Sequence, residues 1–180
     1  MATSLVIVPY LMMEEKETHT IDVLLVSPAS LTDLVIGKGL VGVFYSVIAV
    51  ILVMLMNIKF VAHWPLLLLS ILSGITFAVI TGLFIGLSFE NFQQATLAMS
   101  IVVIIIMAPA FIKLILTVSL PTILDTIVTW LPSGQLAELL FMSLMRVVDL
   151  QSVMLGLSAI WIANLILFGL TISQIQRQMK

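Results

Sequence analysis

Long apolar runs alternate with short polar stretches along the chain, and the lengths of these runs predict helices that cross a membrane. Four runs carry no charged residue, or a single one near an end, and they cover residues 40–58, 66–88, 96–115 and 153–173. A hydrocarbon core of about 30 Å requires about 20 mostly apolar residues in helical form. We therefore expect an all-α polytopic membrane protein, in which these four spans belong to a single transmembrane domain over residues 1–180.

The first thirteen residues, MATSLVIVPYLMM, are apolar but too short to cross a bilayer. A signal peptide is the weakest interpretation, because the stretch lacks a basic start and a small-residue cleavage site. A helix lying on the membrane surface would be broken by Pro9. The favoured interpretation is a partial span over residues 1–13 whose beginning lies outside this chain, and such a short stretch alone would be poorly anchored.

Residues 116–150 are too polar for a span and too apolar for an ordinary loop, and we expect them to form two outer half-helices. Pro121 can open the first, and the LPSG turn at 131–134 precedes the second, with Ser133 as its cap. The polar residues of the second helix fall within about 80° of one another, as in a helix that lies in the interface or enters it part-way. They are Gln135, Glu138, Arg146 and Asp149.

Two acids of this outer segment, Asp125 and Glu138, allow two interpretations. Acids inside a membrane can relay protons, but no basic partner is visible beside either of them. We interpret them as residues on the solvent-facing sides of the two half-inserted helices and assign them no further role.

Small residues recur at every fourth position of the second full span, at Ser70, Gly74, Ala78, Gly82 and Gly86. Lipid gives no hydrophobic drive for helix association, so helices in a bilayer pack by close approach over small residues. We expect this face to contact another helix, more commonly one of the same chain than one of a second copy. Asn164 in the last span is expected to form an interhelical hydrogen bond rather than to bind a ligand.

Composition and charge agree with this class of protein, since 62% of the residues are hydrophobic, 9% are charged and the mean hydropathy is +1.29. The seven basic residues are scattered and offer no surface for nucleic acid. The absence of cysteine excludes thiolate nucleophiles and zinc–thiolate sites. The basic residues favour a cytoplasmic position for residues 14–38 and for the C-terminus, although by a margin of one residue.

Candidate nucleotide and metal motifs fail on their context. Gly37, Gly39 and Gly42 spell GxGxxG, but no strand precedes them and an apolar run follows. The same stretch lacks the upstream glycine and the Ser or Thr of a phosphate-binding loop. His19 and His63 fall on opposite sides of the membrane in this topology and cannot share a metal. We therefore expect no enzymatic activity and no cofactor bound by this chain.

The polar segment EEKETHTIDVLLVSPASLTDLVIGK, residues 14–38, holds five of the nine acidic residues. Its apolar residues share one helical face, at Ile21, Leu24 and Leu25. Pro28 ends that helix, and Ser30 with Asp33 makes a capping box for the next. A solvated connection would explain the polarity, but it would not explain a compact pair of capped helices.

This segment resembles the cytoplasmic signature of ABC-2 type transporter permeases, which runs approximately E-K-E-x-G-T-x-x-x-L-L-x-S-P-x-S-x-x-E-L-x-x-G-K. The residues that correspond to it are Glu15, Lys16, Glu17, Thr20, Leu24, Leu25, Ser27, Pro28, Ser30, Asp33, Leu34, Gly37 and Lys38. Two further stretches are similar to the family, the inner-loop residues Gln93, Gln94 and Ala95 and the outer prolines Pro109, Pro121 and Pro132. The resemblance extends from about residue 5 to the C-terminus.

The resemblance implies a membrane-spanning subunit of an ATP-driven exporter. In such permeases this loop carries a coupling helix that docks on a separate ATP-binding subunit, and it is that subunit that holds ATP and Mg²⁺. The corresponding residues here are Glu17, Thr20, Ile21, Leu24, Leu25 and Pro28. The apolar face would fill a groove on the partner, while the acids would set orientation and encounter rate. The resemblance also implies a dimer with a second or homologous permease, in the cell membrane, with a cytoplasmic C-terminus.

The sequence departs from the family pattern at two places. His19 stands where the family usually has Gly, and the six-span permease domain would lack its first span and retain only residues 1–13 of its second. A truncated or non-transporting membrane scaffold or regulator with the permease fold is therefore the alternative. The spans carry almost no charged or aromatic constellation that would select a cargo, so no substrate is assigned.

Overall fold

A computed structural model describes residues 2–17, 31–57, 61–115, 129–144 and 148–178. Within these ranges the chain is all-helical, and no strand is present. The helices are α1 (Ala2–Glu17), α3 (Leu31–Asn57), α4 (Trp64–Ser88), α5 (Phe92–Ile115), α7 (Pro132–Leu144) and α8 (Leu150–Gln178). This arrangement confirms the all-α class predicted from the sequence.

Four of these helices are long and apolar enough to cross a membrane, as the run lengths predicted. Their apolar stretches are Thr32–Met56, Trp64–Ser88, Phe92–Pro109 and Leu150–Arg177. Helix α3 begins at Leu31 and continues without a break into the apolar run expected from residue 40. It does so because residues 31–39 contain no proline and only two glycines, each of which an α-helix tolerates at a cost of about 1 kcal/mol. The helices therefore extend beyond the apolar runs that identified them.

Helix α4 is the central element of the bundle. In its most apolar window 61% of the residues are buried inside the chain, whereas the values for α3, α5 and α8 are 17%, 17% and 22%. It packs against α1, α3, α5, α7 and α8. Small residues make this possible, because a helix surrounded on several sides needs room for close neighbours.

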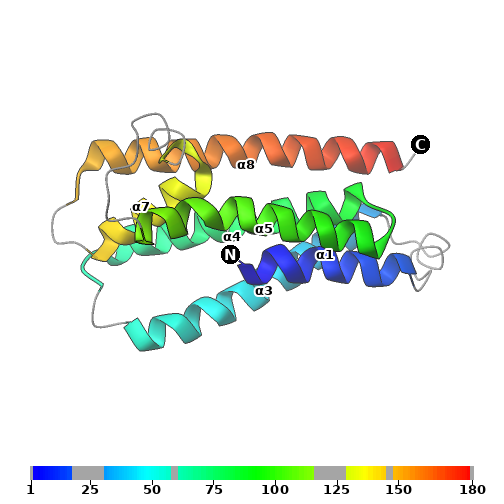
Figure 1. Ribbon diagram of the computed structural model, residues 1–180, viewed down its shortest axis with the longest axis horizontal. Coiled ribbons are helices and arrows are strands. Elements are labelled where there is room, and N and C mark those ends of the chain that lie inside the picture. The colour runs from blue at the N-terminus through cyan, green and yellow to red at the C-terminus, as the bar shows by residue number, and fades with distance from the viewer. Residues whose placement is uncertain (1, 18–30, 58–60, 116–128, 145–147, 179–180) are drawn as a thin grey trace.

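The two ends of the bundle differ in what they carry, as Figure 1 shows. The end of α1, the start of α3, the turn between α4 and α5 and the end of α8 gather on the right of that view. Helix α7 and the start of α4 lie at the opposite end, on the left. The long helices thus run antiparallel in succession, and the end of α1 and the start of α3 lie at the end of the bundle where α8 finishes.

Helix α1 is one continuous helix of 16 residues that includes Pro9. The expectation that Pro9 would break a helix here was wrong. The proline ring lies where α1 crosses the glycines of α4, since a β-carbon on Gly82 would be 3.2 Å from Pro9 Cδ. Neighbouring helices commonly compensate for proline in membrane helices. At about 24 Å by its rise per residue, α1 is shorter than a hydrocarbon core.

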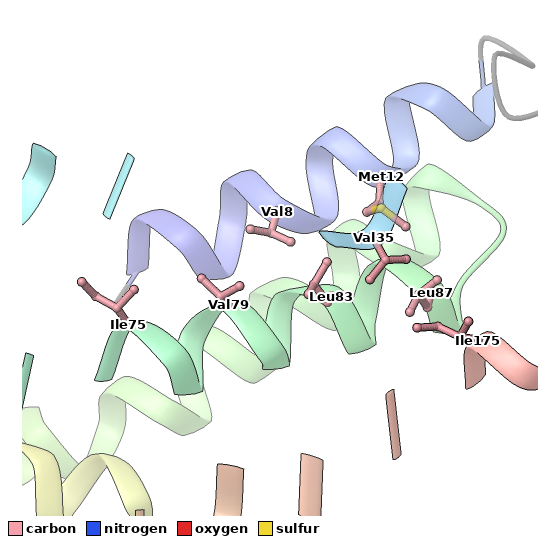
Figure 2. Packing of buried hydrophobic residues seen from close by; sticks show 8 residues of the cluster. All are labelled: Val8, Met12, Val35, Ile75, Val79, Leu83, Leu87 and Ile175. Carbon is pink, nitrogen blue, oxygen red and sulfur yellow. The ribbon is translucent and has the colours of Figure 1, made fainter. Parts of the chain in front are cut away.

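Although α1 is short, it is held firmly in the bundle between α3, α4 and α5. Its apolar residues Leu5, Val8, Met12 and Met13 are at most 1% exposed. Figure 2 shows Val8 and Met12 in a cluster formed with residues of three other helices, Val35, Ile75, Val79, Leu83, Leu87 and Ile175. The stretch is therefore not isolated, because packing against three helices supplies contacts that its length does not.

The outer segment differs from its predicted form at two positions. Helix α7 begins with Pro132, and the amide of Gln135 donates to the carbonyl of Leu131, so Ser133 lies inside the first turn and does not cap it. Proline at the first helical position is favoured because its missing N–H has no intrahelical role there. Helix α7 ends at Leu144, and Asp149 instead caps α8.

Asp149 was expected on the polar face of the second outer half-helix, but it lies just before α8 and caps that helix instead. Its carboxylate accepts hydrogen bonds from the amides of Gln151 and Ser152, at 3.2 and 3.3 Å, and from the Ser152 hydroxyl, at 2.7 Å. The first amides of a helix have no intrahelical acceptor, so an acid just before them satisfies these groups. The same bonds, led by that from the Ser152 hydroxyl, lower the pKa of Asp149.

Candidate functional site

The structure describes only one of the residues predicted to bind a partner. Glu17 is the exposed last residue of α1. The others lie outside the described residues, and they are Thr20, Ile21, Leu24, Leu25 and Pro28. The candidate site is therefore built from the helix ends that flank residues 18–30.

An ion pair joins the two helices on either side of this segment. The ammonium of Lys38 on α3 lies 2.5 Å from a carboxylate oxygen of Glu15 on α1. Both side chains are about one-fifth exposed, at 20% and 22%, so the pair is shielded more than an ordinary surface pair. The last turn of α1 is thus tied to the second turn of α3.

Lys16 ties the same turn of α1 to α4. Its ammonium donates hydrogen bonds to the carbonyls of Gly86, at 2.8 Å, and Phe89, at 2.7 Å. The last carbonyls of a helix lack intrahelical donors and carry partial negative charge, so a cation is favoured there. Burial lowers the pKa of Lys16, and the nearby carboxylate of Glu90 opposes this shift.

The packing residues predicted on α4 lie in two groups. Gly82 and Gly86 face α1: added β-carbons would lie 3.1 Å from the Ser4 carbonyl oxygen and 2.9 Å from Met12 Cβ, respectively. Ala78 is fully buried in a cluster with Leu5 of α1. Ser70 and Gly74 are also buried, and the Ser70 hydroxyl donates to the carbonyl of Leu66 within α4.

Helix α3 contributes glycines that the sequence interpretation left without a role. An added β-carbon on Gly42 would overlap a methyl group of Val8 on α1, and one on Gly39 would contact Leu83 of α4 at 3.4 Å. Gly37, by contrast, has nothing within 4 Å of that position. The GxGxxG spacing was rejected as a nucleotide site, but its second and third glycines were also a signal for close helix packing.

Asn164 forms the interhelical contact expected of it. Its Nδ2 atom lies 3.3 Å from the Thr76 hydroxyl and 3.5 Å from the Ser73 carbonyl oxygen, both on α4. The side chain is 3% exposed, and its Oδ1 atom has no hydrogen-bond partner within the described part of the chain. One end of the amide therefore links α8 to α4, while the other end contributes nothing to the contact.

The described residues contain no group of three or more His, Cys, Asp or Glu side chains that could hold a metal ion. Of the two acids considered for proton relay, Asp125 lies outside the described residues and Glu138 is half-buried on α7. The residues that this structure gathers are thus helix ends, glycines and an ion pair.

An all-helical bundle with four helices long and apolar enough to cross a membrane, and with an ion pair that joins α1 to α3, defines a polytopic membrane component. Residues 1–173 match the family described as ABC-2 family transporter protein. The chain therefore belongs to this family, the membrane-embedded permease component of ABC transporters. No curated protein and no solved structure shows significant similarity to the chain.

Proposed function

We propose that this chain is the membrane-spanning subunit of an ATP-driven exporter and that a coupling helix over residues 20–25 docks on a separate ATP-binding subunit. Membership of the ABC-2 family supports this proposal, because the family supplies the membrane component and not the ATPase. Binding of ATP would bring two such subunits together and displace the docked segment. The substrate path would lie between this chain and a second or homologous permease.

The single observation that carries the proposal is the pair of tethers beside the segment. Glu15 pairs with Lys38, and Lys16 binds the carbonyls at the end of α4. A force on the coupling helix over residues 20–25 would therefore meet the ends of α1, α3 and α4 joined to one another, rather than three helix ends that move independently. Such a connection favours a rigid-body rearrangement of the helices.

The proposed orientation places the right-hand end of Figure 1 in the cytoplasm, with the C-terminus of α8. The basic residues Lys16, Lys38, Arg177 and Lys180 would then lie inside, and Lys59, Lys113 and Arg146 outside. This agrees in sign with the preference of cytoplasmic loops for Lys and Arg. Helix α7 would lie on the outer side as a half-helix beside the exit of the path.

The substitution Leu24→Asp tests the proposal by placing a charge on the apolar face that would fill the partner's groove. We expect it to abolish transport-coupled ATP hydrolysis in the native complex and to leave the amount of protein in the membrane unchanged. Leu24→Met keeps apolar character and volume, so it serves as the matched control. Unchanged ATP hydrolysis in Leu24→Asp would favour a non-transporting scaffold with the permease fold.

A further inference from the structure

Hydrogen bonds join each end of α4 to another helix, to α1 at its C-terminal end and to α7 at its N-terminal end. At its C-terminal end, Lys16 of α1 donates to the carbonyls of Gly86 and Phe89. At its N-terminal end, the amides of Ala62 and His63, just before α4, donate to the carbonyl of Ser143 at 3.1 and 2.9 Å. Ser143 belongs to the last turn of α7, where helix carbonyls lack intrahelical donors.

The helix between these tethers is suited to carrying a displacement from one to the other. Its 25 residues form one uninterrupted helix, whose only proline, Pro65, is in the first turn, where proline is tolerated. A helix of this length spans about 37 Å. Because it is buried by neighbours along most of its length, it has little freedom to bend and absorb a shift at one end.

Helix α4 packs against α1 and α3 toward one end of the molecule and against α7 toward the other, while α8 packs on it at both ends. The half near Gly86 contacts α1 and α3 through Val8, Met12 and Val35. At the other end, Leu66 shares a cluster with Leu136 and Leu139 of α7 and with Val153 and Ile160 of α8. No direct contact between α1 and α7 is required for a shift at one end to reach the other.

We infer that α4 transmits displacement of the α1 end to α7, with Lys16 as the positioning residue at the inner tether and the Ser143 carbonyl as the outer tether. This inference rests on the proposed function for its role in transport. The mechanical link between the two tethers does not depend on the proposed function, because it can be tested in this chain without any partner. A transmission route requires evidence that its two ends are energetically coupled. The hydrogen bonds of the outer tether provide a measurable signal of such coupling.

Hydrogen exchange at the Ala62 and His63 amides reports on the outer tether, since both amides are hydrogen-bonded to Ser143. We would measure it by mass spectrometry on the full chain in lipid nanodiscs, comparing the wild type with Lys16→Met. Loss of the inner tether should accelerate exchange at these two amides about fivefold, the factor that corresponds to one ordinary hydrogen bond. Acceleration confined to α1 and the end of α4 would overturn the inference.

Two further variants keep the test decisive. Arg177→Met removes a positive charge from the same end of the bundle without touching α4's carbonyls, and it should leave exchange at Ala62 and His63 unchanged. Glu15→Gln breaks the ion pair to Lys38 but leaves the Lys16 bonds, and it should also leave these amides unchanged. If either variant accelerates them as much as Lys16→Met does, the effect is not specific to the inner tether and the inference fails.

The result is separable from the proposed function. Exchange in nanodiscs requires no ATP-binding subunit, so failure to find such a subunit would remove the proposed function and leave the transmission inference standing. Conversely, capture of an ATP-binding subunit together with unchanged exchange in Lys16→Met would overturn only the inference.

Discussion

Val8 of α1 lies directly over Gly42 of α3, so closely that a β-carbon on residue 42 would overlap one of its methyl groups. On its other side, Val8 Cβ is 3.1 Å from where a β-carbon of Gly82 on α4 would lie. A fully buried valine is thus held between glycines of two different helices. This contact fixes the crossing of α1, α3 and α4 and anchors the shortest helix of the three.

Gly42→Ala is predicted to destabilise the chain, because the new methyl group has no room beside Val8. Overpacking of this kind costs about 1–3 kcal/mol, and the better helix propensity of alanine offsets about 1 kcal/mol of that cost. The midpoint of thermal unfolding in detergent should fall for Gly42→Ala, and the fall in the double variant with Val8→Ala should be smaller than the sum of the falls in the two single variants. Gly37→Ala is the matched control, since that position has open space around it and should gain stability slightly. Equal midpoints for the two alanine variants would contradict the crossing.

The four long helices could be predicted because the length of an apolar run is compared with a fixed bilayer thickness, which requires no knowledge of tertiary contacts. The boundaries were less predictable. Helix α3 begins at Leu31, where hydropathy is not yet high, and α1 passes through Pro9, where local preference opposes a helix. For α3 the decisive factor is that the helix continues from the apolar run into the residues before it. For α1 it is packing against other helices. A short window of sequence shows neither.

The tethers of the candidate site were not predictable, because they join residues that meet only in three dimensions. Lys16 and its acceptor carbonyls are 70 and 73 positions apart, and nothing in either local sequence marks them as partners. The signature that contains Glu15, Lys16 and Lys38 identified the segment but not these contacts. The stripe of small residues on α4 predicted that a helix would pack there, yet its spacing could not identify α1 as that helix.

Thr76→Val is predicted to weaken the contact between α4 and α8 by only about 0.6 kcal/mol, the average for hydrogen bonds between membrane helices. The reason is that Asn164 reaches the Thr76 hydroxyl at 3.3 Å, which is long, and leaves its Oδ1 atom without a described partner. A double-mutant cycle of Thr76→Val with Asn164→Leu, followed by thermal unfolding, measures the coupling. A coupling of several kcal/mol would contradict a weak contact.

The cap at Asp149 is predicted to make the first turn of α8 sensitive to acid. Hydrogen bonds from Ser152 and Gln151 lower the pKa of Asp149 below its usual value of 3.8, so the stabilisation is complete above that value. It is lost as the pH falls through the lowered pKa, when the carboxylate becomes protonated. Protection of the Gln151 and Ser152 amides, corrected for intrinsic exchange, should therefore fall below pH 3.8. In Asp149→Asn, which keeps an acceptor without the charge, protection should not change with pH over this range; a matching fall there would exclude the carboxylate as the cause.

Topology can be tested with single cysteines, because the natural chain has none. Cysteines at Gln94 and Gln176, both exposed at the end where α8 finishes, should react with a membrane-impermeant maleimide only after the membrane is opened. A cysteine at Ala62, exposed at the opposite end, should react in intact cells. Labelling of Gln94 and Gln176 positions on opposite sides would contradict the bundle, and labelling of both in intact cells would invert the proposed orientation.

The central claim is that the coupling helix over residues 20–25 docks on an ATP-binding subunit, and site-specific photocrosslinking from position 21 in native membranes tests it most directly. With a photoreactive residue in place of Ile21, the account predicts capture of an ATP-binding cassette protein, identified by mass spectrometry. The same residue in place of Trp64, exposed at the other end of the bundle, should capture no such protein. If position 21 captures no ATP-binding cassette protein while the chain is present at its normal level, the coupling role is contradicted and the chain is a scaffold with a transporter fold.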